Sequence, residues 1–148
     1  GRMRERYDVI KNDRLKKYEI KTGEFDIDIY LPHYSELGID IEDIERSAIV
    51  KEGFRVPSVE ALFLLKLCAW RARAGTPKGE KDELDIFSMA SMPEFNWTEY
   101  RNLVKKYDVG DLHKKFLGLL KKTIEIKELE INRQAVAKLK KEILSKLN

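Results

Sequence analysis

A ten-residue apolar run in the middle of the chain constrains the fold more than any other feature. Residues 61–70 read ALFLLKLCAW, in which Lys66 is the only charged side chain. A helix of this composition is apolar on nearly every side, so it has to be buried. Pro57 and Ser58 predict where this helix begins, with Ser58 as the N-cap, and Gly75 predicts where it ends.

Lys66 raises a question of charge, because a buried ammonium group needs a negative partner. Two interpretations stay open at this point. In the first, the Lys66 amine pairs with Asp26, with Asp28 or with a bound phosphate. In the second, the side chain lies along the helix and its amine reaches water.

Alternating patterns ahead of the apolar helix predict strands. Residues 16–32 read as a hairpin with its turn at Thr22-Gly23, and residues 46–57 read as a second, shorter hairpin. Helical patterns follow at about 81–90, 96–107, 111–122 and beyond Asn132. The fold class is therefore α+β: a small mixed or antiparallel sheet from the N-terminal hairpins, followed by a helical C-terminal region. We place the boundary between residues 1–57 and residues 58–148.

Composition excludes several classes of protein. Cys68 is the single cysteine among 148 residues, so no internal disulfide forms, and no apolar run approaches the roughly 18 residues of a membrane span. No signal peptide is visible, and we expect a cytoplasmic protein without a membrane partner. Charged residues make up 37% of the chain, glutamine occurs once, and Lys, Glu and Ile are frequent, a bias that resembles proteins of heat-loving organisms.

Positive charge is concentrated in the predicted helices. Residues 98–127 carry eight Lys or Arg against four acids, although the net charge of the chain is only +3. The commoner interpretation is a set of solvated helix faces, and the alternative is a nucleic-acid surface. In the last helix, Val136, Leu139, Ile143 and Leu147 form one apolar stripe, which is typical of core but also suits a partner helix.

Two acidic residues in the first hairpin are candidates for chemistry. Asp26 and Asp28 are two apart in a predicted strand, so both project to the same face. Neighbouring carboxylates repel each other, which favours a positive group opposite them.

A basic segment follows the apolar helix. Residues 71–82 (RARAGTPKGEKD) gather Arg71, Arg73, Lys78 and Lys81 around a short glycine-containing loop, for which phosphate is the natural ligand. Helix periodicity places Arg73 two turns from Lys66, on roughly the same face. The alternative is a solvated connection between helices. Asp82 and Asp85 then follow in the first turn of a helix, where acids are stabilising without any further role.

The order of these segments resembles the latter part of the nucleotidyltransferase-fold (DNA polymerase beta-like) superfamily, specifically the prokaryotic AbiEii-type group found among toxin-antitoxin systems. The resemblance is carried by FDIDIYLP, then VPSVEALFLLKLCAWRAR, then KDELDI, over about 65 residues from Tyr18 to Met89. The matching positions are Asp28, then Pro57, Leu62, Lys66, Ala69 and Arg71 or Arg73, then Lys81, Asp82 and Asp85.

This resemblance implies transfer of a nucleoside monophosphate from a nucleoside triphosphate to an acceptor, with Mg²⁺ (or Mn²⁺) as cofactor. Asp28 would be the activating carboxylate and metal ligand, with Asp26 beside it, and Asp82 would join them in catalysis. Lys66, Lys81, Arg71 and Arg73 would bind the triphosphate or the acceptor. The acceptor would be a nucleic acid or a partner protein.

The same resemblance implies that residues 1–57 lack the first half of the domain. The family's Gly-Ser turn and its paired metal-binding carboxylates do not occur before the first hairpin. We therefore expect a truncated or incomplete catalytic domain. Two alternatives stay open: a non-catalytic module of the same ancestry that binds nucleic acid or protein, and a helical interaction protein that binds no nucleotide.

Overall fold

The apolar helix lies at the centre of the molecule. The computed structural model describes residues 8–12, 17–21, 26–30, 43–44, 49–51, 54–123 and 132–147. The apolar run lies in α2 (Val59–Arg73), whose residues 59–70 are all buried. Ser58 caps this helix as predicted, because its Oγ accepts a hydrogen bond from the Ala61 amide at 3.1 Å. The prediction of a buried helix is confirmed.

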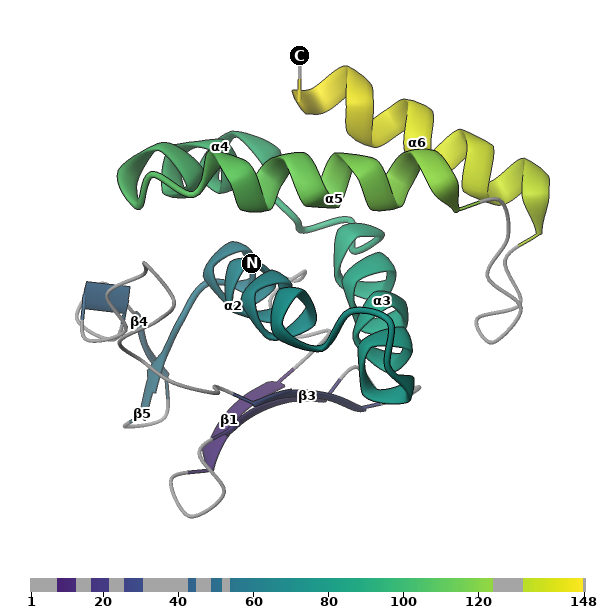
Figure 1. Cartoon of the computed structure of the whole chain (residues 1–148). Coiled ribbons are helices and arrows are strands. Elements are labelled where there is room, and N and C mark those ends of the chain that lie inside the picture. The colour runs from purple at the N-terminus through teal and green to yellow at the C-terminus, as the bar shows by residue number, and fades with distance from the viewer. Residues whose placement is uncertain are drawn as a thin grey trace.

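Helix α2 is covered on different sides by strands and by helices (Figure 1). β1 (Asp8–Asn12), β2 (Lys17–Lys21) and β3 (Asp26–Tyr30) pair antiparallel in that order, and β4 (Ile49–Lys51) pairs with β5 (Phe54–Val56). α3 (Pro77–Ala90) lies beside α2, while α4 (Trp97–Lys106) and α5 (Gly110–Lys122) cover another side of it. α6 (Arg133–Leu147) packs on α4. The prediction of a helical region after the strands is confirmed for the residues that the structure describes.

One cross-strand pair connects the strands to the helical core. Ile20 in β2 and Ile27 in β3 are direct partners in the ladder, and both side chains are fully buried. β3 contacts α2, so this pair belongs to the same hydrophobic core as α2. Strand β1 was not predicted, because DVIKN is short and does not alternate between apolar and polar residues.

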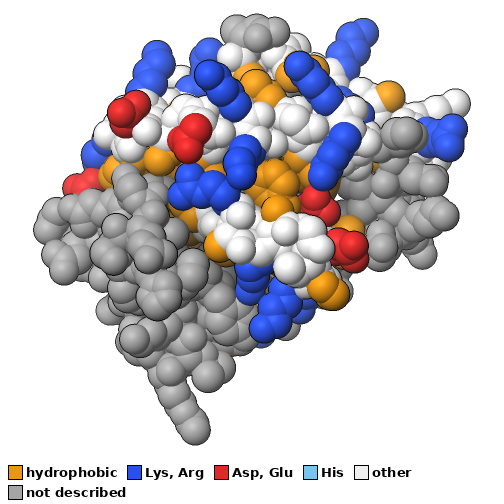
Figure 2. Space-filling view, in the orientation of Figure 1, with side chains coloured by type: hydrophobic (Ala, Val, Ile, Leu, Met, Phe, Trp, Pro, Cys, Tyr) orange, Lys and Arg blue, Asp and Glu red, His pale blue; other side chains and the backbone are white. Residues whose placement is uncertain are grey.

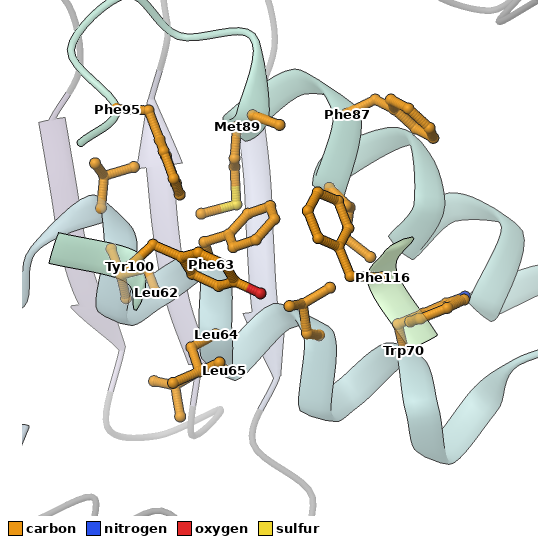
Figure 3. Packing of buried hydrophobic residues seen from close by; sticks show 14 of the residues in the cluster. Leu62, Phe63, Leu64, Leu65, Trp70, Phe87, Met89, Phe95, Tyr100 and Phe116 are labelled. Atoms are coloured by element: carbon orange, nitrogen blue, oxygen red, sulfur yellow. The ribbon is translucent and has the colours of Figure 1, made fainter. Parts of the chain in front are cut away.

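An aromatic cluster fills the contact of α2 with α4 and α5. The ring of Phe63 meets those of Phe95, Trp97, Tyr100 and Phe116 edge to face, with centroids 5.0 to 6.0 Å apart. Figure 3 shows Phe63 among Phe95, Tyr100 and Phe116. Edge-to-face contacts are a preferred arrangement of aromatic rings and add to the free energy of burying them. We call these five residues the aromatic cluster.

One helix boundary differs from the prediction. α3 begins at Pro77, four residues before the predicted Lys81, because Thr76 caps it by accepting a hydrogen bond from the Gly79 amide at 3.1 Å. Proline is well suited to the first helical position, since its missing N–H would have no partner there. The connection that was predicted as a glycine-containing loop is therefore largely helical.

The other helices agree with their predictions. Asn96 caps α4 by accepting a hydrogen bond from the Glu99 amide, as the sequence predicts. In α6, Val136 and Ile143 are buried and Leu139 and Leu147 are partly buried, so the apolar stripe is core. Among the described residues, no helix is both long and apolar enough to cross a membrane.

Candidate functional site

Four charged side chains meet between α2 and α3, and we call them the charge cluster. Lys66 Nζ lies 2.9 Å from Asp82 Oδ1 and 2.7 Å from Asp85 Oδ2. Arg73 completes the cluster by donating from Nε to Asp82 Oδ2 at 2.8 Å and from Nη2 to Asp82 Oδ1. Two cations and two carboxylates are thus held in one hydrogen-bonded group.

The charge cluster is almost closed to water. The side chains of Lys66 and Asp82 are each 2% exposed and that of Asp85 is 9% exposed, whereas that of Arg73 is 27% exposed. Removing charges from water costs several kcal/mol per ion, which only close pairing offsets. Lys66 therefore has the negative partners that its position requires, and the alternative in which its amine reaches water is wrong.

Two partners of Lys66 were not expected from the sequence. The pairing expected with Asp26, Asp28 or a bound phosphate stays a prediction, because the side chains of Asp26 and Asp28 lie outside the described residues. The described carboxylates opposite Lys66 are Asp82 and Asp85. The available signal was the three-residue spacing of these aspartates, which places both on one face of a helix. That signal was missed because acids in a first turn already have a simpler explanation, the helix dipole.

The sequence between α2 and α3 brings these residues together. Gly75 has a φ of +83°, a left-handed conformation that glycine adopts at little cost and that ends α2. Gly79 lies so close to the end of α2 that an added Cβ would be 2.2 Å from the carbonyl oxygen of Arg73. This close approach places the first turns of α3 beside the last turns of α2, where Arg73 reaches Asp82. The prediction that Arg73 shares a face with Lys66 is confirmed.

The electrostatics of the cluster follow from burial and pairing. Burial raises the pKa of Asp85 above its ordinary value, and the nearby Lys66 ammonium counteracts part of that rise. Both oxygens of Asp82 accept hydrogen bonds from Arg73, and one of them also meets Lys66. A carboxylate engaged in this way is poorly placed to accept a proton from a substrate.

The other predicted cations lie around the charge cluster rather than in it. Arg71 Nη1 lies 3.4 Å from Oδ2 of Asp111, which belongs to α5 and not to α3. The Arg71 side chain is 26% exposed. Lys78 and Lys81 are exposed on the first turns of α3. Of the predicted substrate-binding residues, Lys66 and Arg73 therefore lie together, while Lys81 is nearby and Arg71 contacts a different helix.

The predicted catalytic pair is described only through its backbone. Asp26 and Asp28 lie in β3, where Asp26 is the ladder partner of Lys21 and Asp28 is the partner of Glu19. Their side chains lie outside the described residues, so their contacts stay a prediction. The turn predicted at Thr22-Gly23 lies outside the described residues as well.

The described carboxylates of the cluster do not suit a magnesium ion. Mg²⁺ would meet Asp82 and Asp85 where Lys66 and Arg73 already neutralise them, and like charges would repel it. Within the described ranges, no three His, Cys, Asp or Glu side chains come together as a metal-binding group. A metal site at Asp26 and Asp28 stays a prediction from the resemblance.

Glu60, Cys68 and Tyr100 are further titratable groups that are buried in the described part of the chain, outside the charge cluster. Burial raises the pKa of Glu60 to about 7 and that of Cys68 to about 11. A thiol of such high pKa is a poor nucleophile, which agrees with a packing role for Cys68. The Tyr100 hydroxyl lies 2.9 Å from His113 Nδ1, and burial lowers the pKa of His113.

Comparison with known proteins gives no relative for this chain. No protein-family model, no curated protein and no solved structure matches it. The resemblance to nucleotidyltransferases therefore rests on the residue pattern and stays a prediction.

Proposed function

We propose that this chain is part of a nucleotidyltransferase-like protein, which transfers a nucleoside monophosphate from a nucleoside triphosphate to an acceptor. In this proposal the strands form the sheet of an α+β domain, with residues 1–57 as its sheet-forming part and residues 58–148 as its helical part. The family's glycine turn and its paired metal-binding carboxylates, which do not occur before the first hairpin, would have to come from another part of the protein.

The observation that supports the proposal is the charge cluster. Two of the three segments that carry the resemblance contain these residues, Lys66 and Arg73 in one and Asp82 and Asp85 in the other. All four side chains meet in one group, in which only Arg73 is more than 9% exposed. Buried ion pairs are weak contributors to stability and apolar residues of similar size often replace them at no cost. Their presence therefore favours a role in fixing the geometry of a site.

The structure suggests different roles for the four residues. Lys66 and Asp82 are too deeply buried to touch a triphosphate directly, so the proposal makes them positioning residues rather than catalytic ones. Arg73 is the most exposed member, and a guanidinium held by Asp82 in a fixed orientation suits an anionic ligand. Lys81 and Arg71 would add positive charge near it.

The metal chemistry of the proposal is assigned to β3. Asp28 would hold Mg²⁺ (or Mn²⁺) and activate the acceptor hydroxyl, with Asp26 as its neighbour. A divalent ion would supply charge neutralisation for the triphosphate when it is bound.

The test is a transfer assay on the longest natural protein that contains these residues. Labelled nucleoside triphosphates and a pool of cellular RNA and protein acceptors are supplied with Mg²⁺, and label transferred to acceptor is measured. We expect Asp28→Ala to abolish transfer while the melting temperature stays within a few degrees of the parent protein. Glu142→Gln, which removes one exposed carboxylate from α6, is the control and should leave transfer unchanged.

A second variant tests the role given to Arg73. Arg73→Lys keeps the charge but loses the paired hydrogen bonds to Asp82, so we expect KM for the triphosphate to rise more than kcat falls. Full activity of Asp28→Ala would contradict the assignment of the metal site. Unchanged KM in Arg73→Lys would mean that the charge cluster is structural only.

A second candidate function is a nucleic-acid-binding module without catalysis. The residues of α4, α5 and α6 include twelve Lys or Arg against three acids. Figure 2 shows many Lys and Arg side chains over this helical part of the surface. Retained nucleic-acid binding in a protein that neither binds triphosphate nor transfers label would favour this candidate.

A further inference from the structure

A glycine in the middle of α5 is surrounded by lysines. The nearest neighbours of any residue on a helix surface are three and four positions away, with Cβ atoms about 5–6 Å apart. For Gly118 these four positions are Lys114, Lys115, Lys121 and Lys122, and all five residues are exposed. We call these five residues the lysine patch.

Packing does not explain why position 118 is glycine. A Cβ built on Gly118 has no atom within 4 Å, and its φ is not in the left-handed region. Glycine inside a helix is less favourable than alanine, because it loses more backbone freedom on folding. A missing side chain at the centre of four ammonium groups allows another molecule to approach the helix backbone closely.

The charges of the lysine patch are largely uncompensated. Within the described part of the chain, Lys114, Lys115 and Lys121 form no ion pair, and Lys122 Nζ is 3.6 Å from Glu83. Asp111, the acid one turn before Lys114, is engaged by Arg71 at 3.4 Å. Lys140 of α6 adds a further cation nearby, since its Nζ donates to the carbonyl oxygen of Lys121 at 3.3 Å.

We propose that the lysine patch binds the phosphate backbone of a nucleic-acid strand. Lysines act as point charges on phosphates and need no particular base sequence, so four of them around a flat centre suit a backbone that crosses the helix. The close approach at Gly118 is where one phosphate or sugar lies against α5.

The composition of this surface argues against a membrane or a protein as its partner. A helix that binds membranes presents Trp, Phe or Leu beside its basic residues, whereas the single large hydrophobic residue exposed in the described structure is Leu144, in α6. Protein interfaces are enriched in aromatic residues and depleted in lysine at their centres. The lysine patch has lysines and a glycine at its centre, which is the opposite composition.

This inference deepens the proposed function by naming its acceptor class, a nucleic acid. It rests on the proposed function only for the role of the bound strand as acceptor. Binding itself is measured without triphosphate or metal, so failure of transfer and failure of binding are separate results.

The experiment compares two variants of equal charge. In the first, Lys114, Lys115, Lys121 and Lys122 are all changed to Gln. In the control, Lys105, Lys138, Lys141 and Lys146 are changed to Gln, which removes the same charge from other exposed positions. Affinity for a fluorescent single-stranded RNA of mixed sequence is measured by anisotropy at several salt concentrations, with circular dichroism to verify folding.

We expect the first variant to lose about tenfold or more in affinity at moderate salt, and its log–log salt slope to fall by about 3, from four lost contacts at roughly 0.7 each. The control should keep most of its affinity. Equal losses in both variants would mean that overall charge binds the RNA, and an unchanged first variant would mean that the lysines are a solvated face. Either result would overturn the proposal.

Gly118→Ala tests the close approach separately. The methyl group should raise the melting temperature, because alanine is the better helix former. At the same time it should lower RNA affinity severalfold without altering the salt slope, since no charge is lost. Unchanged affinity in Gly118→Ala would show that the lysines bind without contact at position 118, and would overturn that part of the proposal.

Discussion

Within a single turn, helix α2 makes two chemically different contacts. Towards α4 and α5 it presents Phe63 to the aromatic cluster, and towards α3 it presents Lys66 to the charge cluster. The residues of both contacts are nearly or fully buried, except Arg73, whose side chain is 27% exposed. They differ in how far their side chains can shift before the contact loses stability.

The aromatic cluster gains stability from area, and small shifts of its rings cost little as long as no cavity opens. The charge cluster depends on distances of 2.7–2.9 Å, and any shift leaves a charge without a partner. The comparison teaches that one helix can be held in place by an apolar contact and aligned by an ionic one. Each variant below breaks or sharpens that difference.

The largest effect is expected at the aromatic cluster. Phe63→Ala removes the central ring from four neighbours, and we expect a loss of about 3–5 kcal/mol in the free energy of unfolding. Urea denaturation followed by circular dichroism measures it. Leu144→Ala, at an exposed leucine, should change stability by less than about 0.5 kcal/mol. A loss below about 1 kcal/mol for Phe63→Ala would mean that the cluster is not closely packed.

The next effect is expected at the charge cluster. Lys66→Met keeps the apolar stem but leaves two carboxylates with one cation, and we expect a loss of about 3 kcal/mol at pH 7. Adding Asp85→Asn should restore at least half of this loss, because the remaining Arg73–Asp82 pair is electrically balanced. Lys138→Met at an exposed site is the control. A double variant no more stable than Lys66→Met would show that packing, and not charge, governs this contact.

A smaller effect is expected at Glu60, in the first turn of α2, where a pH series tests whether a buried charge is tolerated. The folded pKa of Glu60 is about 7 against an ordinary value of 4.5, and burial is the largest cause. Because the folded state holds the proton more tightly, stability is full below about pH 4.5 and is lost as pH rises through 7. Glu60→Gln should therefore be about 2–3 kcal/mol more stable than the parent at pH 8 and nearly equal at pH 4.5. Parallel stability–pH curves for the two proteins would contradict this prediction.

The smallest effect concerns the one polar contact of the aromatic cluster. Tyr100→Phe removes the hydroxyl that lies 2.9 Å from His113 Nδ1, and we expect a loss of about 1 kcal/mol. Thermal melting resolves a change of this size. Tyr100→Leu should cost clearly more, since it also removes the ring, and equal losses in the two variants would mean that the ring contributes nothing.

Much of the helical region could be predicted from sequence because its signals are local. Ser58 and Asn96 cap the helices that the apolar spacing predicts, and the stripe of α6 is buried or partly buried. The start of α3 was predicted too late, because Gly79 suggested a loop while Thr76 and Pro77 begin a helix.

The candidate site was predicted only in part because its contacts are not local. The sequence shows that Lys66 needs a counter-charge, but which of several aspartates supplies it depends on how α2 and α3 pack. Periodicity was sufficient for Lys66 and Arg73, which share one helix. The partner across the interface required the close approach at Gly79, which no periodicity reveals.

Glycines 79 and 118 should respond in opposite ways to random substitution. In a saturation library selected for folding alone, position 79 should return almost only glycine, because the smallest side chain would already strike the backbone of Arg73. Position 118 should accept nearly any residue except proline under the same selection, since open space surrounds it. A selection for nucleic-acid binding would then restore the preference for glycine at 118, so the two screens together would separate a glycine kept for folding from one kept for a ligand.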